Sequence, residues 1–160
     1  MAKDTCVPIV IREASEADQA AIKAIVRSAR INPTGLTWPS FLVAEESGRV
    51  VGVGQVKAHK DGSRELASIA VIPERKRQGI GSRIISALLD RESGPLYLMC
   101  TDNLEGYYTR FQFRRIEASD LPRSMYVGFT IGRRIIPILA LLVRRKIRLI
   151  AMKREATSVE

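Results

Sequence analysis

The feature that most constrains this sequence is a glycine-containing turn between a strand-like apolar segment and an amphipathic helical segment. The first segment, residues 65–72, is followed by Pro73, and the helical segment opens at about Gly81. Gly79 and Gly81 place no side chain where the backbone would approach a ligand. The start of the helix presents unpaired N–H groups and the positive end of its dipole. A turn of this kind can cradle a phosphate group.

Basic residues surround the turn and would favour an anion there, since Arg75, Lys76 and Arg77 follow one another. The turn is not a Walker loop, because no Gly-Lys-Ser/Thr follows four spacers. It is not a Gly-x-Gly-x-x-Gly loop either, because the last position is Ile84. Taken alone, the turn also fits a tight structural connection with a solvated basic face.

The rest of the chain predicts strands and helices mixed along a single domain, residues 1–160, of the α/β (α+β) class. Residues 1–7 are expected to be a flexible N-terminus, and residues 128–160 a basic and apolar C-terminal extension with a final strand. Strands are expected at residues 8–13, 41–45, 50–58, 65–72, 96–100, 113–117 and 147–153. Helices are expected at about residues 17–29, 81–90 and 104–111.

Two motifs resemble those of the GNAT (Gcn5-related N-acetyltransferase) superfamily. Residues 65–81 resemble its central Arg/Gln-x-x-Gly-x-Gly/Ala motif, which follows a strand and a proline, and residues 106–113 (Gly-Tyr-Tyr-Thr-Arg-Phe-Gln-Phe) resemble its Phe-Tyr-x-x-x-Gly-Phe segment. The sequence departs from these patterns at Lys76, at Gln112 in place of the glycine, and at Thr101, where many members carry Asn. Lys76 keeps the positive charge, and Arg77 is the alternative for its role.

The resemblance implies a mixed, mostly antiparallel central sheet of six to seven strands flanked by helices, splayed between strands four and five. It implies acetyl-CoA as co-substrate and no metal. Pantetheine would pair with the backbone of the fourth strand, and the pyrophosphate would bind the amides of the turn. The residues expected to bind the cofactor are Ile69, Ala70, Val71, Lys76, Arg77, Gln78, Gly79, Ile80, Gly81 and Ser82.

The expected reaction is acetyl transfer from acetyl-CoA to a primary amine by direct attack in a ternary complex. Tyr108 stands at the family's tyrosine position, and a phenol of pKa about 10 can protonate a thiolate of pKa about 8.5 or higher. The alternatives are Tyr107 as the acid and Tyr108 as a core aromatic. Glu65 is the expected base, on the face that strand alternation gives to Ile69 and Val71, and a surface charge is its alternative. Lone His59, beside a turn, is expected to be a solvated residue.

The C-terminal segment carries most of the net charge of +9, with eight basic and no acidic residues from Arg133 to Arg154. The apolar run 135–143 within it is shorter than the roughly 20 residues that span a bilayer. We therefore expect it to pack its apolar side on the sheet beneath a basic rim. A membrane surface is the alternative partner, while nucleic acid is disfavoured because no aromatic residue lies between Arg133 and Arg154.

Other classes of function are less consistent with the sequence. Cys6 and Cys100 fit neither a disulfide framework nor a zinc site, and the N-terminal residues have no secretory pattern, so a cytoplasmic location is expected. The sequence does not identify the amine acceptor, and it leaves open whether the protein forms a homodimer. A non-catalytic acyl-CoA-binding or membrane-surface-associated protein is the alternative to the enzyme.

Overall fold

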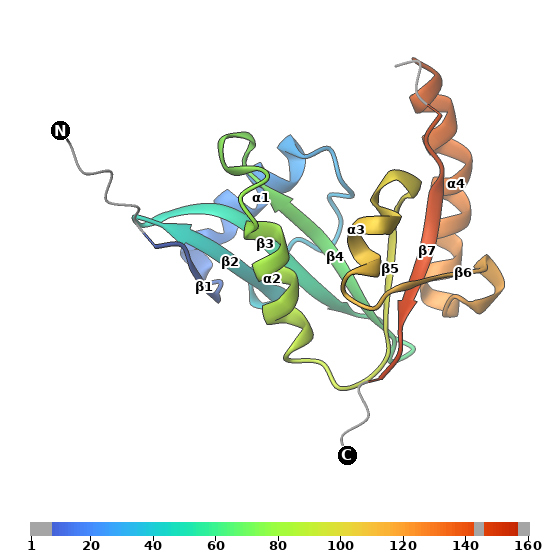
Figure 1. The fold of residues 1–160 in the computed structure, drawn as a ribbon, viewed down its shortest axis with the longest axis horizontal. Helices are drawn as coiled ribbons and strands as arrows, with labels where there is room; N and C mark the ends of the chain where they lie inside the picture. The colour runs from blue at the N-terminus through green and yellow to red at the C-terminus, as the bar shows by residue number, and fades with distance from the viewer. Residues whose placement is uncertain (1–7, 143–145, 157–160) are drawn as a thin grey trace. The chain divides into compact units, whose positions relative to one another are not determined.

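The computed structural model describes residues 8–142 and 146–156 and contains a mixed seven-stranded sheet with helices α1 to α4 (Figure 1). The strand order is β1-β2-β3-β4-β5-β7-β6. The expected strands are present, with slightly shifted ends, so the predicted fold class is confirmed. The chain divides into two compact units. Unit 1 comprises Met1–Lys57 and Ala67–Arg91, and unit 2 comprises Ala58–Leu66 and Glu92–Glu160. The expected flexible segment, residues 1–7, lies outside the described residues.

Unit 1 contains the N-terminal strands and the first two helices. Its elements are β1 (Val10–Glu13), α1 (Gln19–Ser28), β2 (Phe41–Glu46), β3 (Arg49–Ala58), β4 (Arg64–Val71) and α2 (Ile80–Leu89), with the last residue of β3 and the start of β4 assigned to unit 2. β1 pairs antiparallel with β2, and β2 with β3. A capping box precedes α1, since the Ser15 amide donates to the Asp18 carboxylate at 2.7 Å.

The core of unit 1 explains the position of α2. α1 buries Ile22, Ile25 and Val26 in one cluster with residues of β2, β3 and β4. α2 packs closely on β3 at Gly54, where an added Cβ would lie 2.6 Å from both Ile69 Cδ1 and Ile84 Cγ2. A glycine at this position therefore allows α2 to approach the sheet, and this packing holds the N-terminus of α2 in place.

Unit 2 contains the C-terminal strands and helices. Its further elements are β5 (Leu96–Thr101), α3 (Glu105–Thr109), β6 (Arg114–Ile116), α4 (Arg123–Leu142) and β7 (Leu149–Arg154). β5 pairs with β4 in parallel through Glu65 and Tyr97, and β7 pairs antiparallel with both β5 and β6. β7 is the final strand that the sequence predicts.

Helix α4 differs from the sequence-based expectation. The described part of the apolar run 135–143 belongs to a 20-residue helix that begins at Arg123 and continues through Pro137. Ala140 is buried, but five other residues of the run are between 48% and 79% exposed, namely Ile135, Ile138, Leu139, Leu141 and Leu142. The prediction that the run packs its apolar side on the sheet is therefore wrong for these residues. The reason is that Met125 and Phe129, on the opposite side of the helix, supply its main contacts with the core.

The argument from length against a membrane span also fails, because the helix is longer than the apolar run. By length and composition alone, Arg123–Leu142 is long and apolar enough to cross a membrane, with a mean hydropathy of 1.5 over an 18-residue window that is 17% buried. Core helices of soluble proteins can pass the same test. Whether the helix spans a membrane must therefore be judged from the position of its charged residues and from its packing.

Candidate functional site

The turn between β4 and α2, in unit 1, is built by local conformational preferences. Pro73 opens a short 3-10 turn, Pro73–Arg75, and Lys76 returns to an extended conformation. Arg77 has a φ of 60° and Gly79 a φ of 78°, which is the left-handed region that glycine adopts without steric cost. α2 then begins at Ile80, so the strand–turn–helix order predicted from the sequence is confirmed.

The start of α2 has the geometry of an anion cradle. In the part of the chain that the structure describes, no side chain caps the helix at Gly79, and no heavy atom comes within 4 Å of the position of an added Cβ there, neighbours aside. The backbone N–H groups of the first helical turn have no partner within the helix, and they point outward. Gly79 is exposed and Gly81 is half-buried. The backbone can therefore be approached by a phosphate group without a side chain in the way.

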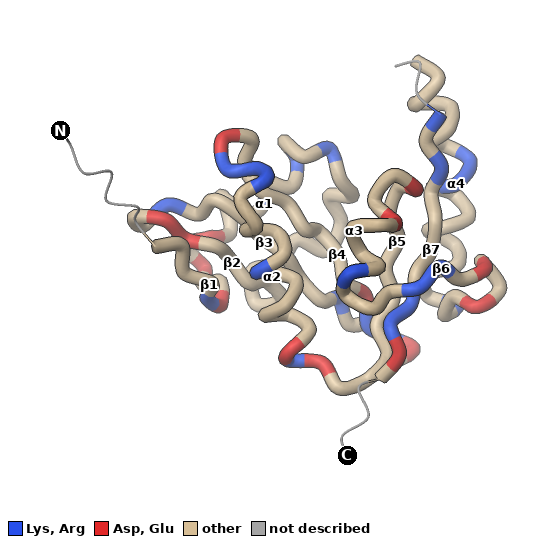
Figure 2. The backbone as a smooth tube through the Cα atoms, viewed as in Figure 1, with Lys and Arg blue, Asp and Glu red and all other residues tan. Residues whose placement is uncertain are grey.

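The basic residues of the turn have different partners. Arg75 is engaged by Glu46, whose carboxylate accepts from Arg75 Nε at 2.9 Å. Lys76 and Arg77 are exposed and form no ion pair with any residue in the described ranges 8–142 and 146–156. Figure 2 shows that the loop preceding α2 is rich in basic residues. We infer that Arg75 fixes the loop, while Lys76 and Arg77 remain available to an anion.

The second half of β4 carries the residues expected to pair with pantetheine. Ala70 is buried in the core, whereas Ile69 and Val71 are half-buried. Val71 and Lys76 also line a pocket of about 400 Å³ formed by α1, the start of β3 and the turn. The backbone of this half-strand therefore lies beside a hollow on the same unit.

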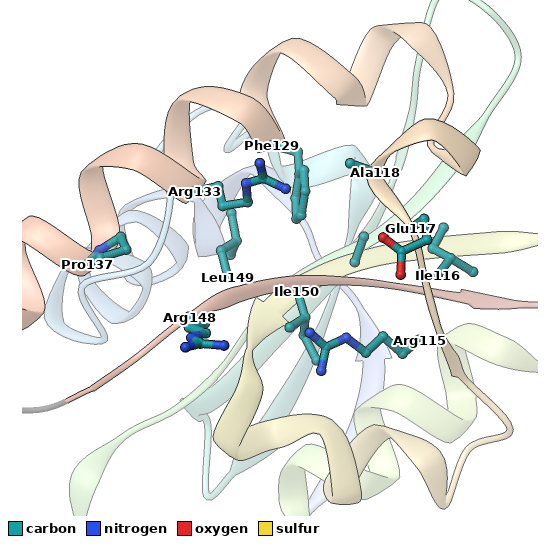
Figure 3. Close-up of a pocket in the computed structure, with 11 residues that line it drawn as sticks. Arg115, Ile116, Glu117, Ala118, Phe129, Arg133, Pro137, Arg148, Leu149 and Ile150 are labelled. Carbon is teal, nitrogen blue, oxygen red and sulfur yellow. The ribbon is translucent and has the colours of Figure 1, made fainter.

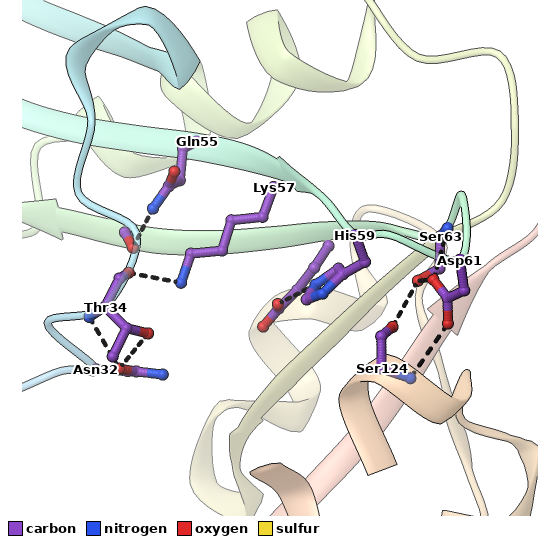
Figure 4. Close-up of polar contacts among 10 residues, drawn as sticks. Asn32, Thr34, Gln55, Lys57, His59, Asp61, Ser63 and Ser124 are labelled. Atoms are coloured by element: carbon purple, nitrogen blue, oxygen red, sulfur yellow. Dashed lines mark hydrogen bonds and ion pairs between the residues drawn. The ribbon is translucent and has the colours of Figure 1, made fainter. Parts of the chain in front are cut away.

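An irregularity in β4 changes the predicted alternation of its side chains. Ser68 has a φ of 57°, a value that breaks the regular pleat of a strand, as in a β-bulge. Its hydroxyl accepts a 2.8 Å hydrogen bond from the Gln55 amide (Figure 4). The expectation that Glu65 shares a face with Ile69 and Val71 assumed unbroken alternation between them. That assumption is wrong, because Ser68 interrupts it.

In unit 2, Glu65 is paired with His59. Glu65 is only 8% exposed, so the alternative of a surface charge at the start of the strand is wrong. Its carboxylate lies 2.8 Å from His59 Nε2 (Figure 4). The expectation that His59 is merely solvated is also wrong, because its ring is mostly buried and paired. The signal in the sequence was the Asp61-Gly62 turn between them, which brings together residues on either side of it in a hairpin.

The loop that carries His59 is held by a second set of hydrogen bonds. Asp61 accepts bonds from the Ser63 hydroxyl at 2.6 Å and from the Ser124 amide, at the start of α4, at 3.2 Å. These bonds, first those of Ser63 and then those of Ser124, lower the pKa of the Asp61 carboxyl well below its usual range. Figure 4 shows Asp61, Ser63 and Ser124 together. The loop beside the His59–Glu65 pair is therefore tied to α4.

Tyr108 and Tyr107 lie on α3, also in unit 2, in different surroundings. The Tyr108 ring meets Phe113 edge to face, with centroids 6.2 Å apart, whereas the Tyr107 ring contacts Phe111 and the Arg110 guanidinium. Burial raises the pKa of the Tyr108 phenol above its ordinary value, and the nearby Cys100 adds to the shift. Tyr108 is therefore a neutral hydrogen-bond donor across the physiological pH range.

A pocket of about 340 Å³ in unit 2 was not anticipated from the sequence. It is formed by α4, β7 and the segment that follows β6, and its lining includes Arg115, Arg133, Arg148 and Phe129 (Figure 3). These arginines are far apart in the sequence and carry no motif. Within residues 8–142 and 146–156, no group of three or more His, Cys, Asp or Glu side chains is placed to hold a metal ion.

The structure thus places the predicted residues in two groups. The turn and the second half of β4 belong to unit 1, and Glu65 and Tyr108 belong to unit 2. The first group contains an open helix N-terminus and two exposed cations, and the second contains a buried carboxylate paired with a half-buried imidazole, and a half-buried phenol.

Residues 37–115 match the model of an acetyltransferase (GNAT) domain. No curated protein matches the sequence. Among solved structures, the chain is similar to N-acetylglutamate synthase from Neisseria gonorrhoeae complexed with coenzyme A and N-acetyl-glutamate, with a TM-score of 0.74 and 18% identity over 94% of this chain and 36% of that chain. The chain thus spans about a third of the length of that synthase.

Two smaller proteins are matched over nearly their whole length. They are Rv2747 from Mycobacterium tuberculosis in complex with CoA (TM-score 0.68, 23% identity, 92% of this chain and 99% of that chain) and the ribosomal-protein-S18-alanine N-acetyltransferase from Escherichia coli (TM-score 0.66, 16% identity, 96% and 97%). These structures share the fold of this chain. The match to the family model shows that residues 37–115 of the chain are a GNAT acetyltransferase domain.

Proposed function

We propose that the chain is an acetyl-CoA-dependent N-acetyltransferase that transfers the acetyl group directly to a primary amine in a ternary complex. The observation that carries the proposal is the open, glycine-capped N-terminus of α2 directly after β4, in a chain with a GNAT domain. The similar structures from Neisseria and Mycobacterium are complexes with coenzyme A. Membership of the family and the geometry of the turn support the same co-substrate.

Unit 1 would hold the co-substrate. The pyrophosphate would accept hydrogen bonds from the amides of residues 77–82, with Lys76 and Arg77 neutralising its charge. The backbone of Ile69–Val71 would pair with the pantetheine amides. Ala70 is buried in the core, so this part of the strand is fixed before the ligand arrives and loses little entropy on binding.

The acceptor amine must lose a proton before it can attack. The His59–Glu65 pair, 2.8 Å apart, supplies a base. Either the imidazole takes the proton while the carboxylate stabilises the resulting cation, or the carboxylate accepts it through a water. The amine nitrogen then forms a bond to the acetyl carbon, and the negative charge moves to the carbonyl oxygen until the C–S bond breaks.

The leaving thiolate must gain a proton, and Tyr108 is the proposed donor. Burial raises the pKa of this phenol, which by itself would weaken it as an acid. Apolar surroundings also raise the pKa of a thiol. The buried Cys100 is an example, because burial raises the pKa of its thiol to about 12. The phenol and a desolvated thiolate therefore remain comparable in proton affinity.

The experiment is a turnover assay with purified full-length protein, acetyl-CoA and a thiol reagent that reports free CoA. The panel of acceptors contains free amino acids including L-glutamate, peptides with an N-terminal alanine, and peptides with an internal lysine. Because relatives of similar fold act on different amines, the panel covers each class. CoA release that depends on one acceptor supports the proposal. Calorimetric binding of acetyl-CoA without transfer to any amine would favour a non-catalytic acyl-CoA-binding protein instead.

A further inference from the structure

Helix α4 exposes a continuous apolar face. Val127, Ile131, Ile135, Ile138 and Leu142 recur at intervals of three or four residues, so they lie along one side of the helix. They are 62%, 54%, 48%, 66% and 79% exposed, respectively. Single exposed apolar residues are ordinary on protein surfaces, but a row of large aliphatic side chains along one helix indicates an interaction surface.

The opposite side of the same helix is firmly attached to unit 2. Met125 and Phe129 are buried in a cluster with Leu121 and Ala151. At Gly132 the helix approaches β7 so closely that an added Cβ would lie 2.9 Å from Leu149 Cδ2. The side of α4 that contacts the core of unit 2 is therefore the one opposite to the exposed row.

The charge around this face has a single sign. From Leu121 to Arg154 the sequence contains nine basic residues and no acidic residue. Arg123 and Arg134 are exposed on α4, and Lys146 and Arg148 are exposed before β7. Figure 2 shows basic residues and no acidic residue along α4. An aliphatic row bordered by cations is the pattern of helices that lie in the plane of an anionic lipid surface.

We propose that α4 binds an anionic lipid bilayer, with the row from Val127 to Leu142 inserted among the acyl chains and the neighbouring cations on the lipid headgroups. This activity is separate from acetyl transfer. The cytoplasmic location expected from the sequence would present the helix to a leaflet rich in anionic lipids.

Two other occupants fit the same face less well. A second copy of the chain would bring Arg123 and Arg134 of both copies together in a self-complementary interface, and the segment 121–154 has no acid to pair with them. A membrane-spanning arrangement would place Arg133 and Arg134 near the bilayer centre, where charged side chains are costly. It would also detach Met125 and Phe129 from their core.

The test is co-sedimentation of the full-length protein with vesicles of phosphatidylcholine alone and of phosphatidylcholine mixed with phosphatidylglycerol. We expect binding to the mixed vesicles, weaker binding to the neutral ones, and partial retention at high salt. Ile131→Gln with Ile138→Gln should reduce binding at least about tenfold, since each change removes apolar surface from the bilayer. Val10→Gln, at a 53% exposed position on β1, is the control for loss of an exposed apolar side chain.

A second pair of variants tests whether the cations of α4 matter more for binding than cations elsewhere on the surface. Arg123→Gln with Arg134→Gln should weaken binding about fivefold for each charge removed. Lys23→Gln with Arg27→Gln removes the same charge from exposed positions of α1 and should have little effect. Equal losses in the two pairs would mean unspecific attraction and would overturn the proposal.

Depth of insertion gives an independent readout. An environment-sensitive fluorophore on Ile138→Cys, in a Cys6→Ser background, should shift to the blue with anionic vesicles, while the same label on Lys23→Cys should not. No shift, or binding that high salt abolishes entirely, would overturn insertion. Resistance to alkaline extraction would indicate a span, and self-association lost in the Ile131→Gln/Ile138→Gln variant without lipid binding would indicate a second copy. Either result would refute the proposal.

Discussion

Replacing Gly54 by alanine tests how α2, and with it the anion cradle, is held. The added Cβ would lie 2.6 Å from Ile69 Cδ1, 2.6 Å from Ile84 Cγ2 and 3.3 Å from Leu88 Cδ1. Separations below 3.0 Å require the neighbours to move, and these neighbours are Ile69 on β4 and Ile84, which is fully buried on α2. Overpacking of this kind costs about 1–3 kcal/mol. For a chain of this length, that corresponds to a melting temperature lower by roughly 2–12 °C.

The assay is thermal unfolding followed by circular dichroism, together with calorimetric titration of acetyl-CoA. Gly94→Ala is the matched control, because the same change there meets no heavy atom within 4 Å in the described part of the chain. We expect Gly54→Ala to lower both the melting temperature and the affinity for acetyl-CoA, since α2 must shift away from β3. If Gly54→Ala and Gly94→Ala unfold at the same temperature, the close packing of α2 on β3 is refuted. If the melting temperature falls but the affinity for acetyl-CoA is unchanged, the anion cradle does not depend on the packing of α2 on β3.

Two further predictions concern the candidate site, and a third concerns the stability of unit 1. Gly81→Val should reduce acetyl-CoA affinity strongly in calorimetry while the far-ultraviolet spectrum stays native, because a side chain would occupy the approach to the backbone; unchanged affinity would contradict the cradle. Tyr108→Phe should lower turnover about 10- to 1,000-fold with nearly normal acetyl-CoA affinity, and an equal loss in Tyr107→Phe but not in Tyr108→Phe would reassign the acid. Asp18→Asn should destabilise the protein by about 1–2 kcal/mol near neutral pH in urea unfolding, because Arg12, foremost, holds the pKa of the Asp18 carboxyl far below its usual range. Because the pKa of Asp18 is lowered by folding, its carboxylate stabilises the fold at pH values above the unfolded pKa near 4, and this stabilisation is lost as the pH falls. The difference in free energy of unfolding between Asp18→Asn and the parent should therefore shrink between about pH 5 and pH 2. A difference that is constant with pH would refute the ion pair.

The sequence alone was sufficient for features that depend on neighbouring residues. The Gly79 turn was predicted because turn chemistry acts over a few residues, and the final strand β7 was predicted as well. The order of strands and helices followed from hydrophobic periodicity, and the GNAT motifs lie within continuous segments. These features were predicted without knowledge of the partners that they meet in space.

Tertiary structure decided the features that depend on distant or competing contacts. The pairing of His59 with Glu65 needs a hairpin to close, and the irregular φ of Ser68 broke an alternation that the sequence pattern alone could not reject. The pocket of Arg115, Arg133 and Arg148 joins three separate segments. Helix α4 is apolar on more than one side, so its periodicity could not indicate which side is buried. Only the packing of Met125 and Phe129 against β7 left the opposite side exposed, because a helix with two apolar sides buries whichever one finds a complementary surface.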